Sequence, residues 1–209
     1  FTELGVFESF SPIIQHADRK VSLIFLGNIQ PDLQLDVARL ITSAENIVSD
    51  TMNLWIDMAR SALSDLICRI DILIINEDEA KQLTGEENLA RAAHAILDLG
   101  PSSAIIKRGE YGVALFGDDF SFAAPAYPLD QVIDPTGAGD SFAGGFMGYL
   151  ASVDRIDQDA LRTASIAGST MASFAVEDFG LERIKILTKA DIESRFDAFT
   201  DLTHFKPMG

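Results

Sequence analysis

Residues 134–145 read Asp-Pro-Thr-Gly-Ala-Gly-Asp-Ser-Phe-Ala-Gly-Gly, a glycine-rich turn that runs directly into a helical pattern. The backbone N–H groups in the first turn of a helix have no partner inside the helix, so they form a ready site for an anion. Here they belong to Gly137, Ala138 and Gly139, whose small size lets a phosphate approach the backbone. Asp140 follows in the same turn, where the positive end of the helix dipole keeps a carboxylate ionised. A carboxylate base beside an anion hole is what phosphoryl transfer to a hydroxyl requires.

A simpler interpretation of this stretch is an ordinary turn before a glycine-tolerant buried helix. Each glycine in a helix costs roughly 0.5–1 kcal/mol relative to alanine, so we expect a strand or a ligand to approach the helix closely. The glycines concerned are those at positions 144, 145 and 148.

Two other phosphate motifs do not fit. A P-loop needs a lysine followed by Ser or Thr, and no lysine occurs between Lys107 and Lys185. A dinucleotide fingerprint that starts at Gly137 would need glycine where Phe142 stands.

Length and composition are compatible with one enzyme domain. With 209 residues, 47% of them hydrophobic, the chain can bury a core, and we expect a single domain over residues 1–209. The 16 basic and 32 acidic residues give a net charge of −16, which opposes non-specific binding to nucleic acid or to an anionic membrane. The single cysteine, Cys68, excludes an internal disulfide and a cysteine-based metal cluster. No apolar run approaches the ~20 residues of a membrane span, and no signal-peptide pattern opens the chain, so we expect a cytoplasmic protein.

Strand-like and helix-like patterns alternate along the chain. Strands are predicted over residues 21–26, 47–50, 72–75 and 104–107, and a hairpin over 113–116 and 120–123. Helices are predicted over residues 33–41, 54–67 and 89–99, from about 78, and over most of 138–199. Alternating β and α units predict an α/β fold with a doubly wound, mostly parallel sheet flanked by helices. Ligands of such sheets gather at the carboxyl ends of the strands.

Polar residues follow these strands where the ligand edge is expected. They are Asp50 and Asn53 after one strand, Asn76 and Glu79 after another, and Lys107, Gly109 and Gly112 after a third. All would lie along one rim with the Gly137 turn. Each also has an ordinary structural interpretation: Asn76 and Asn53 can cap helices, and Lys107 can be a solvated lysine at a strand end.

The nine residues Asp-Pro-Thr-Gly-Ala-Gly-Asp-Ser-Phe, at positions 134–142, resemble the C-terminal signature of the ribokinase-like (PfkB) carbohydrate and nucleoside kinases. The resemblance implies an ATP-dependent kinase that phosphorylates a hydroxyl of a small sugar or nucleoside, with Asp140 as the general base. It implies that the amides of residues 137–139 hold the transferring phosphoryl group. In several family members Asp134 and Thr136 lie beside a monovalent-cation site. The implied cofactors are ATP and Mg²⁺, with K⁺ as a further candidate, and a homodimer of the full-length protein is a candidate assembly.

Other segments extend the resemblance. Asn76-x-x-Glu79 resembles the Asn-x-x-Glu element that organises Mg²⁺ and phosphate through water, and Glu79 is the preferred metal-side residue because Mg²⁺ favours oxygen ligands. The segment from Asp50 to Asn53 resembles the Asp-x-x-Asn segment that relatives place near the substrate and the phosphates. Glu79 is not expected to form a closed cage of protein ligands around the metal.

The turn from Lys107 to Gly112 borders the nucleotide in relatives, where its glycines permit close approach and Lys107 is a candidate phosphate ligand. Ser169 lies in the helical segment that lines the adenine pocket in relatives, many of which have Asn there. The resemblance covers nearly the whole chain and corresponds to the C-terminal two-thirds or so of a family member. The lid region and a Gly-Gly-x-x-x-Asn sugar-binding element are therefore expected to lie outside this sequence.

Two alternatives stay open at this point. One is a nucleotide- or sugar-sensing module without turnover, against which the presence of Asp140 argues. The other is an esterase, because Gly139-Asp140-Ser141 resembles the nucleophile block of Gly-Asp-Ser esterases and the segment from Asp201 to His204 resembles their terminal Asp-x-x-His. That enzyme class also needs an Asn for its oxyanion hole, and no Asn occurs after Asn88.

Overall fold

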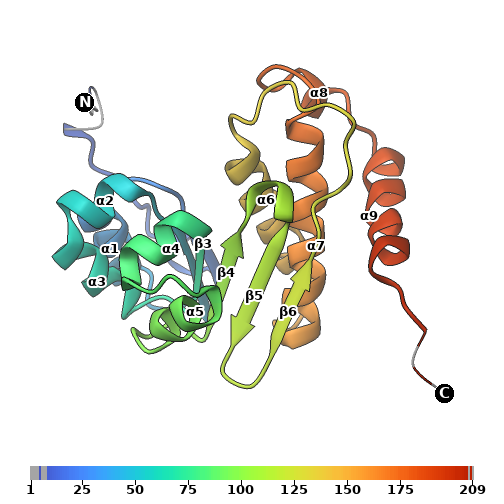
Figure 1. Cartoon of the computed structure of the whole chain (residues 1–209). Helices are drawn as coiled ribbons and strands as arrows, with labels where there is room; N and C mark the ends of the chain where they lie inside the picture. Colours follow the sequence, from blue (N-terminus) through green and yellow to red (C-terminus); the bar gives the residue numbers. More distant parts are fainter. Residues whose placement is uncertain (1–4, 6–8, 207, 209) are drawn as a thin grey trace.

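The computed structural model describes residues 5, 9–206 and 208, and the expected domain over 1–209 is assessed on these residues. Its centre is a six-stranded sheet with the strands in chain order (Figure 1). The strands are β1 (Leu23–Leu26), β2 (Asn46–Asp50), β3 (Ile72–Asn76), β4 (Ser103–Lys107), β5 (Val113–Gly117) and β6 (Ser121–Ala124). Strands β1 to β4 are parallel, whereas β5 and β6 form an antiparallel hairpin at one edge. The mostly parallel sheet that the sequence predicts is confirmed.

Helices cover both faces of the sheet (Figure 1). One face carries α1 (Pro31–Leu40), α2 (Asn53–Met58), α3 (Arg60–Ile67), α4 (Glu77–Thr84) and α5 (Leu89–Leu97). The other carries α6 (Ala138–Leu150) and α7 (Gln158–Ala175), followed by α8 (Glu182–Lys185) and α9 (Lys189–Thr203). The 3₁₀ turns η2 (Ala17–Arg19) and η3 (Gly109–Tyr111) lie before β1 and between β4 and β5. Among the described residues, none of the helices combines the length and apolar character that crossing a membrane needs.

The central strand β3 shows why the fold has three layers. Its side chains alternate between the two faces of the sheet, as in any strand. Leu73 and Ile75 pack into the core under α1 to α5, while Ile72 and Ile74 pack into the core under α6 and α7. Because both faces are covered, the strand reads as a continuous apolar run rather than an alternating one.

The element boundaries differ from the sequence prediction in several places. The helix predicted over residues 54–67 is two helices, because the backbone at Ala59 leaves the helical region with φ −132° and ψ 34°. The apolar spacing continues across this break, so the pattern gives no sign of it. The first strand begins at Leu23 rather than at residue 21. In the hairpin, β5 ends at Gly117 and β6 begins at Ser121, each one residue later than predicted, and the turn closes through the Gly117 N–H, which donates to the Phe120 carbonyl at 2.9 Å.

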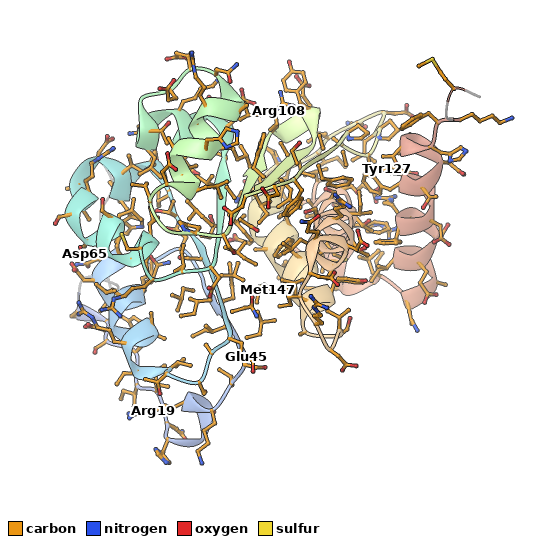
Figure 2. All side chains as sticks on the ribbon, turned by 90° about the horizontal axis from the view of Figure 1, so that it is seen from below. Arg19, Glu45, Asp65, Arg108, Tyr127 and Met147 are labelled. Carbon is orange, nitrogen blue, oxygen red and sulfur yellow. The ribbon has the colours of Figure 1, made fainter. Side chains whose placement is uncertain are left out.

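Helix α9 is attached to the end of α7 by a stacked arginine. The Arg195 guanidinium lies 3.6 Å from the Phe174 ring centroid and 4.6 Å from that of Tyr127, and it pairs with Glu177 at 2.6 Å. Figure 2 shows Tyr127 beside α9. Arg183 pairs with the same Glu177 carboxylate at 2.9 Å, so α7, α8 and α9 are joined through one charge.

Helices α6 and α7 approach closely through glycines. A methyl group at Gly145 would lie 2.6 Å from the Ala167 carbonyl oxygen, and one at Gly168 would lie 2.8 Å from the Phe142 carbonyl oxygen. The expected close approach to the glycine-rich helix is thus met at Gly145 by a neighbouring helix. At Gly144 and Gly148 a methyl group would have no described atom within 4 Å.

This contact can be tested with a matched pair of alanine substitutions. Gly145→Ala should destabilise the fold by about 1–3 kcal/mol, because the added methyl overpacks the α6–α7 contact. Gly144→Ala, one residue away in the same helix, should stabilise it by about 0.5–1 kcal/mol through helix propensity. Urea unfolding of both variants measures the difference. Equal effects of the two substitutions would show that the contact does not limit the packing of α6.

Candidate active site at the start of α6

The turn before α6 folds as a local hydrogen-bonded unit. Gly137 is the N-cap, with a left-handed φ of 79°, a conformation that favours glycine. The Asp134 carboxylate accepts the Thr136 N–H at 3.0 Å, and the Ala138 N–H donates to the Pro135 carbonyl at 3.2 Å. Within the described part of the chain, the N–H groups of Gly137 and Gly139 have no acceptor. Of the amides predicted for the anion hole, Ala138 therefore uses its N–H inside the turn.

A second segment supports this turn from the end of α7. The Ile133 N–H donates to the Val176 carbonyl at 2.8 Å. The pKa of the Asp134 carboxyl lies below its usual range because it accepts hydrogen bonds from Thr136 and, more weakly, from the Gly180 amide. Thr136 itself is exposed. Both contacts come from the segment that follows α7, and they hold the turn before α6 against that segment.

Lys107 connects the rim of the sheet to this turn. Its Nζ lies 3.4 Å from Asp50 Oδ2, so a strand-end lysine of β4 pairs with the last residue of β2 across the end of β3. A methyl group at Gly139 would lie 3.2 Å from the same Nζ. The ammonium therefore stands beside the first turn of α6. Burial raises the pKa of Asp50 above its usual range, Lys107 opposes that shift, and the Asp140 charge adds to it, so these groups share one electrostatic environment.

Asn76 and Glu79 form a complete capping box at the start of α4. The Asn76 side chain accepts the Glu79 N–H at 2.8 Å, and Glu79 Oε2 accepts the Asn76 N–H at 3.0 Å. The structural interpretation of this motif is therefore correct, and it leaves Glu79 Oε1 for other partners. Glu79 is 9% exposed, and burial raises the pKa of its carboxyl, opposed by the amides of Asn76 and Asn53 and by Lys107. Within the described residues, no cluster of three or more His, Cys, Asp or Glu side chains could hold a metal alone.

The raised pKa of Glu79 predicts a pH-dependent stability. A carboxyl that holds its proton more tightly in the folded state contributes stability below its unfolded pKa and loses it as pH rises through the folded pKa. Glu79→Gln removes this titration and keeps an acceptor for the Asn76 N–H. The wild type should therefore lose free energy of unfolding relative to Glu79→Gln as the pH rises from about 4, the ordinary pKa of a glutamate, through its raised pKa in the folded state, measured by denaturant unfolding at stepped pH. A difference that stays constant over that range would contradict the assignment.

The remaining predicted residues lie in varied surroundings. Asn53 is exposed, and its side chain accepts the Leu54 N–H at 2.9 Å. Gly109 has open space around it, whereas a methyl group at Gly112 would meet the Ala124 carbonyl oxygen, so Gly112 is needed for contact with the end of β6. Ser169 is 9% exposed, and its hydroxyl donates to the Ser165 carbonyl at 2.9 Å inside α7.

Sequence reasoning missed Gln34, a buried residue that joins the ends of β1 and β2. Its Nε2 lies 3.0 Å from the Leu26 carbonyl oxygen and 3.1 Å from that of Asp50. In α1 the buried positions are 31, 34, 35 and 38, which is the spacing of one helix face. A glutamine inside that apolar stripe is the signal that could have identified it.

The esterase alternative requires Ser141, Asp201 and His204 to meet. Ser141 lies at the start of α6 next to Phe142, whose carbonyl oxygen faces Gly168 of α7, and Arg195 of α9 reaches Ser173 near the end of α7. From there α9 runs away from the start of α6 (Figure 1). Asp201 and His204 lie at the far end of α9, so the structure does not assemble the triad.

The sequence of this chain is similar to sequences of carbohydrate kinases. The sequence model of the pfkB family carbohydrate kinases matches residues 20–186. A cytidine kinase of Thermococcus kodakarensis is 40% identical over 93 residues, which are 43% of this chain and 33% of that protein. A nucleoside kinase of Methanothermobacter thermautotrophicus is 34% identical over 125 residues, 59% of this chain and 37% of that protein. The chain thus spans about a third of the length of these curated relatives.

Solved structures agree on the fold. The aminoimidazole riboside kinase from Salmonella enterica, complexed with aminoimidazole riboside and an ATP analogue, superposes with a TM-score of 0.72 at 23% identity, covering 83% of this chain and 62% of that one. A nucleoside kinase of Methanocaldococcus jannaschii, an archaeal member of the ribokinase family, gives 0.71 at 20% identity, covering 92% and 60%. The expected ribokinase-like fold class is confirmed.

Proposed function

Since this chain belongs to the pfkB family of carbohydrate kinases, we propose that its protein transfers a phosphoryl group from ATP to a hydroxyl of a small sugar or nucleoside. The observation that carries the proposal is the meeting of three features at the start of α6. They are the N–H groups of Gly137 and Gly139, which have no acceptor among the described residues, the Lys107 ammonium beside Gly139, and the Asp140 carboxylate one residue further on. Together they offer positive charge for a phosphoryl group and a base for a hydroxyl.

In the proposed reaction, the acceptor hydroxyl attacks the γ-phosphorus in line with the leaving ADP oxygen. Asp140 takes the hydroxyl proton as the new P–O bond forms and the bond to ADP breaks. The amides of Gly137 and Gly139 and the Lys107 ammonium stabilise the charge on the transferring oxygens. The Ala138 N–H joins them if the phosphoryl group displaces its contact with the Pro135 carbonyl.

Oxygen donors near the rim suit a magnesium ion. Mg²⁺ keeps several waters and binds through one or two carboxylates together with substrate phosphates, which matches a site that lacks a protein cage. Glu79, whose Oε1 is left over from the capping box, would hold the ion, and Asn76 fixes the orientation of that carboxylate. When bound, Mg²⁺ neutralises charge on the phosphates of ATP.

The other assignments rest on the resemblance and on the names of relatives. Gly109, Gly112, Thr136 and Ser169 are assigned to the nucleotide side, and Asp50 and Asn53 to the neighbourhood of the substrate and the phosphates. Ser169 can serve there only if its buried hydroxyl leaves the Ser165 carbonyl. Asp134 and Thr136 are assigned to a K⁺ site by the resemblance alone.

Removal of the proposed base gives the main test of the function. Asp140→Ala in the full-length protein should lower kcat by at least about 10²-fold, the size expected for a general base, with little change in ATP affinity. Asp159→Asn is the matched control, since Asp159 is an exposed carboxylate in the first turn of α7 and should leave kcat unchanged. A loss below tenfold in Asp140→Ala would remove the assignment of the base.

The acceptor class can be found with a thermal-shift panel on the full-length protein in the presence of ATP and Mg²⁺. Cytidine and other nucleosides come first in the panel, because relatives named cytidine kinase and nucleoside kinase share 40% and 34% identity over their matched parts. A ligand in large excess over its Kd should stabilise the protein by roughly 2–4 kcal/mol. Ligand-induced stabilisation without turnover for any acceptor would favour the sensing module instead.

A further inference from the structure

The Asp50–Lys107 pair is an ion pair of the protein interior. The side chain of Asp50 is 7% exposed and that of Lys107 is 19% exposed, and they come from strands that do not neighbour each other in the sheet. Exposed ion pairs contribute little because water screens them, whereas removal of one partner from a buried pair leaves an uncompensated charge. This pair therefore fixes the position of the Lys107 ammonium.

Asp50 is held rigidly at three atoms. Its Oδ1 accepts the Thr51 N–H at 2.8 Å, its Oδ2 faces Lys107 Nζ, and its carbonyl oxygen accepts from Gln34 Nε2 at 3.1 Å. Both carboxylate oxygens thus have partners within the protein. A residue so fixed and so buried is better placed to hold another side chain than to receive a substrate hydroxyl.

The Lys107 ammonium needs a fixed partner such as Asp50 because the lysine side chain is long and flexible. The loss of side-chain entropy opposes the fixing of a lysine in one rotamer. Two other carboxylates compete with Asp50 for the ammonium. The charges of Asp50 and Lys107 both act on the Glu79 carboxylate, and the charge of Asp140 acts on Asp50, so all of these groups are close together. The Asp50 carboxylate holds the ammonium in a single position, in which Lys107 Nζ would lie 3.2 Å from a methyl group at Gly139.

We propose that Asp50 is a positioning residue that holds the Lys107 ammonium at the start of α6, and that it acts on phosphoryl transfer through this ammonium and not by contact with the acceptor. The inference rests on the proposed function and refines it. It moves Asp50 from the neighbourhood of the acceptor to the support of the phosphate site, and it predicts an effect on ATP that depends on Lys107.

A double-mutant cycle in the full-length protein tests this. The variants are Asp50→Asn, Lys107→Met and the double variant, each assayed for kcat, for the KM of ATP and for the KM of the acceptor. Lys107→Met should lower kcat/KM for ATP about tenfold to a hundredfold, the effect of losing a charge-assisted contact to phosphate. Asp50→Asn should lower it severalfold, and the double variant should match Lys107→Met within about twofold, because coupled residues are non-additive. The acceptor KM should stay within about twofold of wild type throughout.

Two results would overturn the proposal. One is an Asp50→Asn effect of equal size in the wild-type and Lys107→Met backgrounds. The other is an increase confined to the acceptor KM. Val48→Ala is the matched control for a disturbed strand, because Val48 is buried in β2 two residues before Asp50 and its side chain has no polar atom that could hold Asp50 or Lys107, so its ATP parameters should equal those of wild type.

The cycle is repeated on the Kd of a non-hydrolysable ATP analogue, which needs neither acceptor nor turnover. Absence of kinase activity in the wild type would refute the proposed function, while this binding cycle would still decide on the role of Asp50. If Asp50→Asn unfolds under assay conditions, Asp50→Glu takes its place. Asp50→Glu keeps the negative charge but moves the carboxylate by one methylene, and the paired ammonium moves with it. The effect of this variant on analogue binding should vanish in the Lys107→Met background.

Discussion

Parallel pairing of β1 to β4 is the constraint on which the site depends. Parallel strands end at the same edge of a sheet, so residues far apart in the sequence come to one rim there. Asn76 lies opposite Lys107 in the register, and Asp50 lies opposite Ile74. The long side chain of Lys107 can therefore reach over the end of β3 to Asp50. The antiparallel β5 then closes the rim, because its chain returns through η3 directly after Lys107.

The helices on the two faces of the sheet have different structural roles. Right-handed crossovers between neighbouring parallel strands place α1 to α5 on one face, where they connect the strands. At the rim, Asn76 and Glu79 form the capping box that begins α4. The other face is left for α6 and α7, which must bring the glycine-rich turn to the same edge. Their contact at Gly145 and Gly168 lets the helix axes approach closely, and the hydrogen bond from Ile133 to Val176 fixes the turn before α6.

Much of this could be predicted from the sequence because it depends on local pattern. Apolar runs mark the strands, Gly137 marks the start of α6, and the strand-end rule brings Asp50, Asn76 and Lys107 to one rim. What the pattern could not give depends on three-dimensional detail. Asp50 and Lys107 are 57 residues apart, and nothing in the sequence says which charges on the rim pair. The break at Ala59, the Ala138 N–H turned to Pro135 and the buried hydroxyl of Ser169 likewise follow from packing.

The charge of the protein shows why placement matters more than total charge here. A net charge of −16 repels a nucleotide at long range, yet salt screens exposed charges beyond about 8 Å at physiological ionic strength. At the rim, the carboxylates of Asp50, Glu79 and Asp140 share one neighbourhood with the Lys107 ammonium. In such surroundings an ammonium that exchanged between several carboxylates would not be in a fixed position to bind a phosphate. Held by Asp50 beside the amides of α6, it adds a fixed positive charge at short range, where the low dielectric of a partly buried site strengthens it.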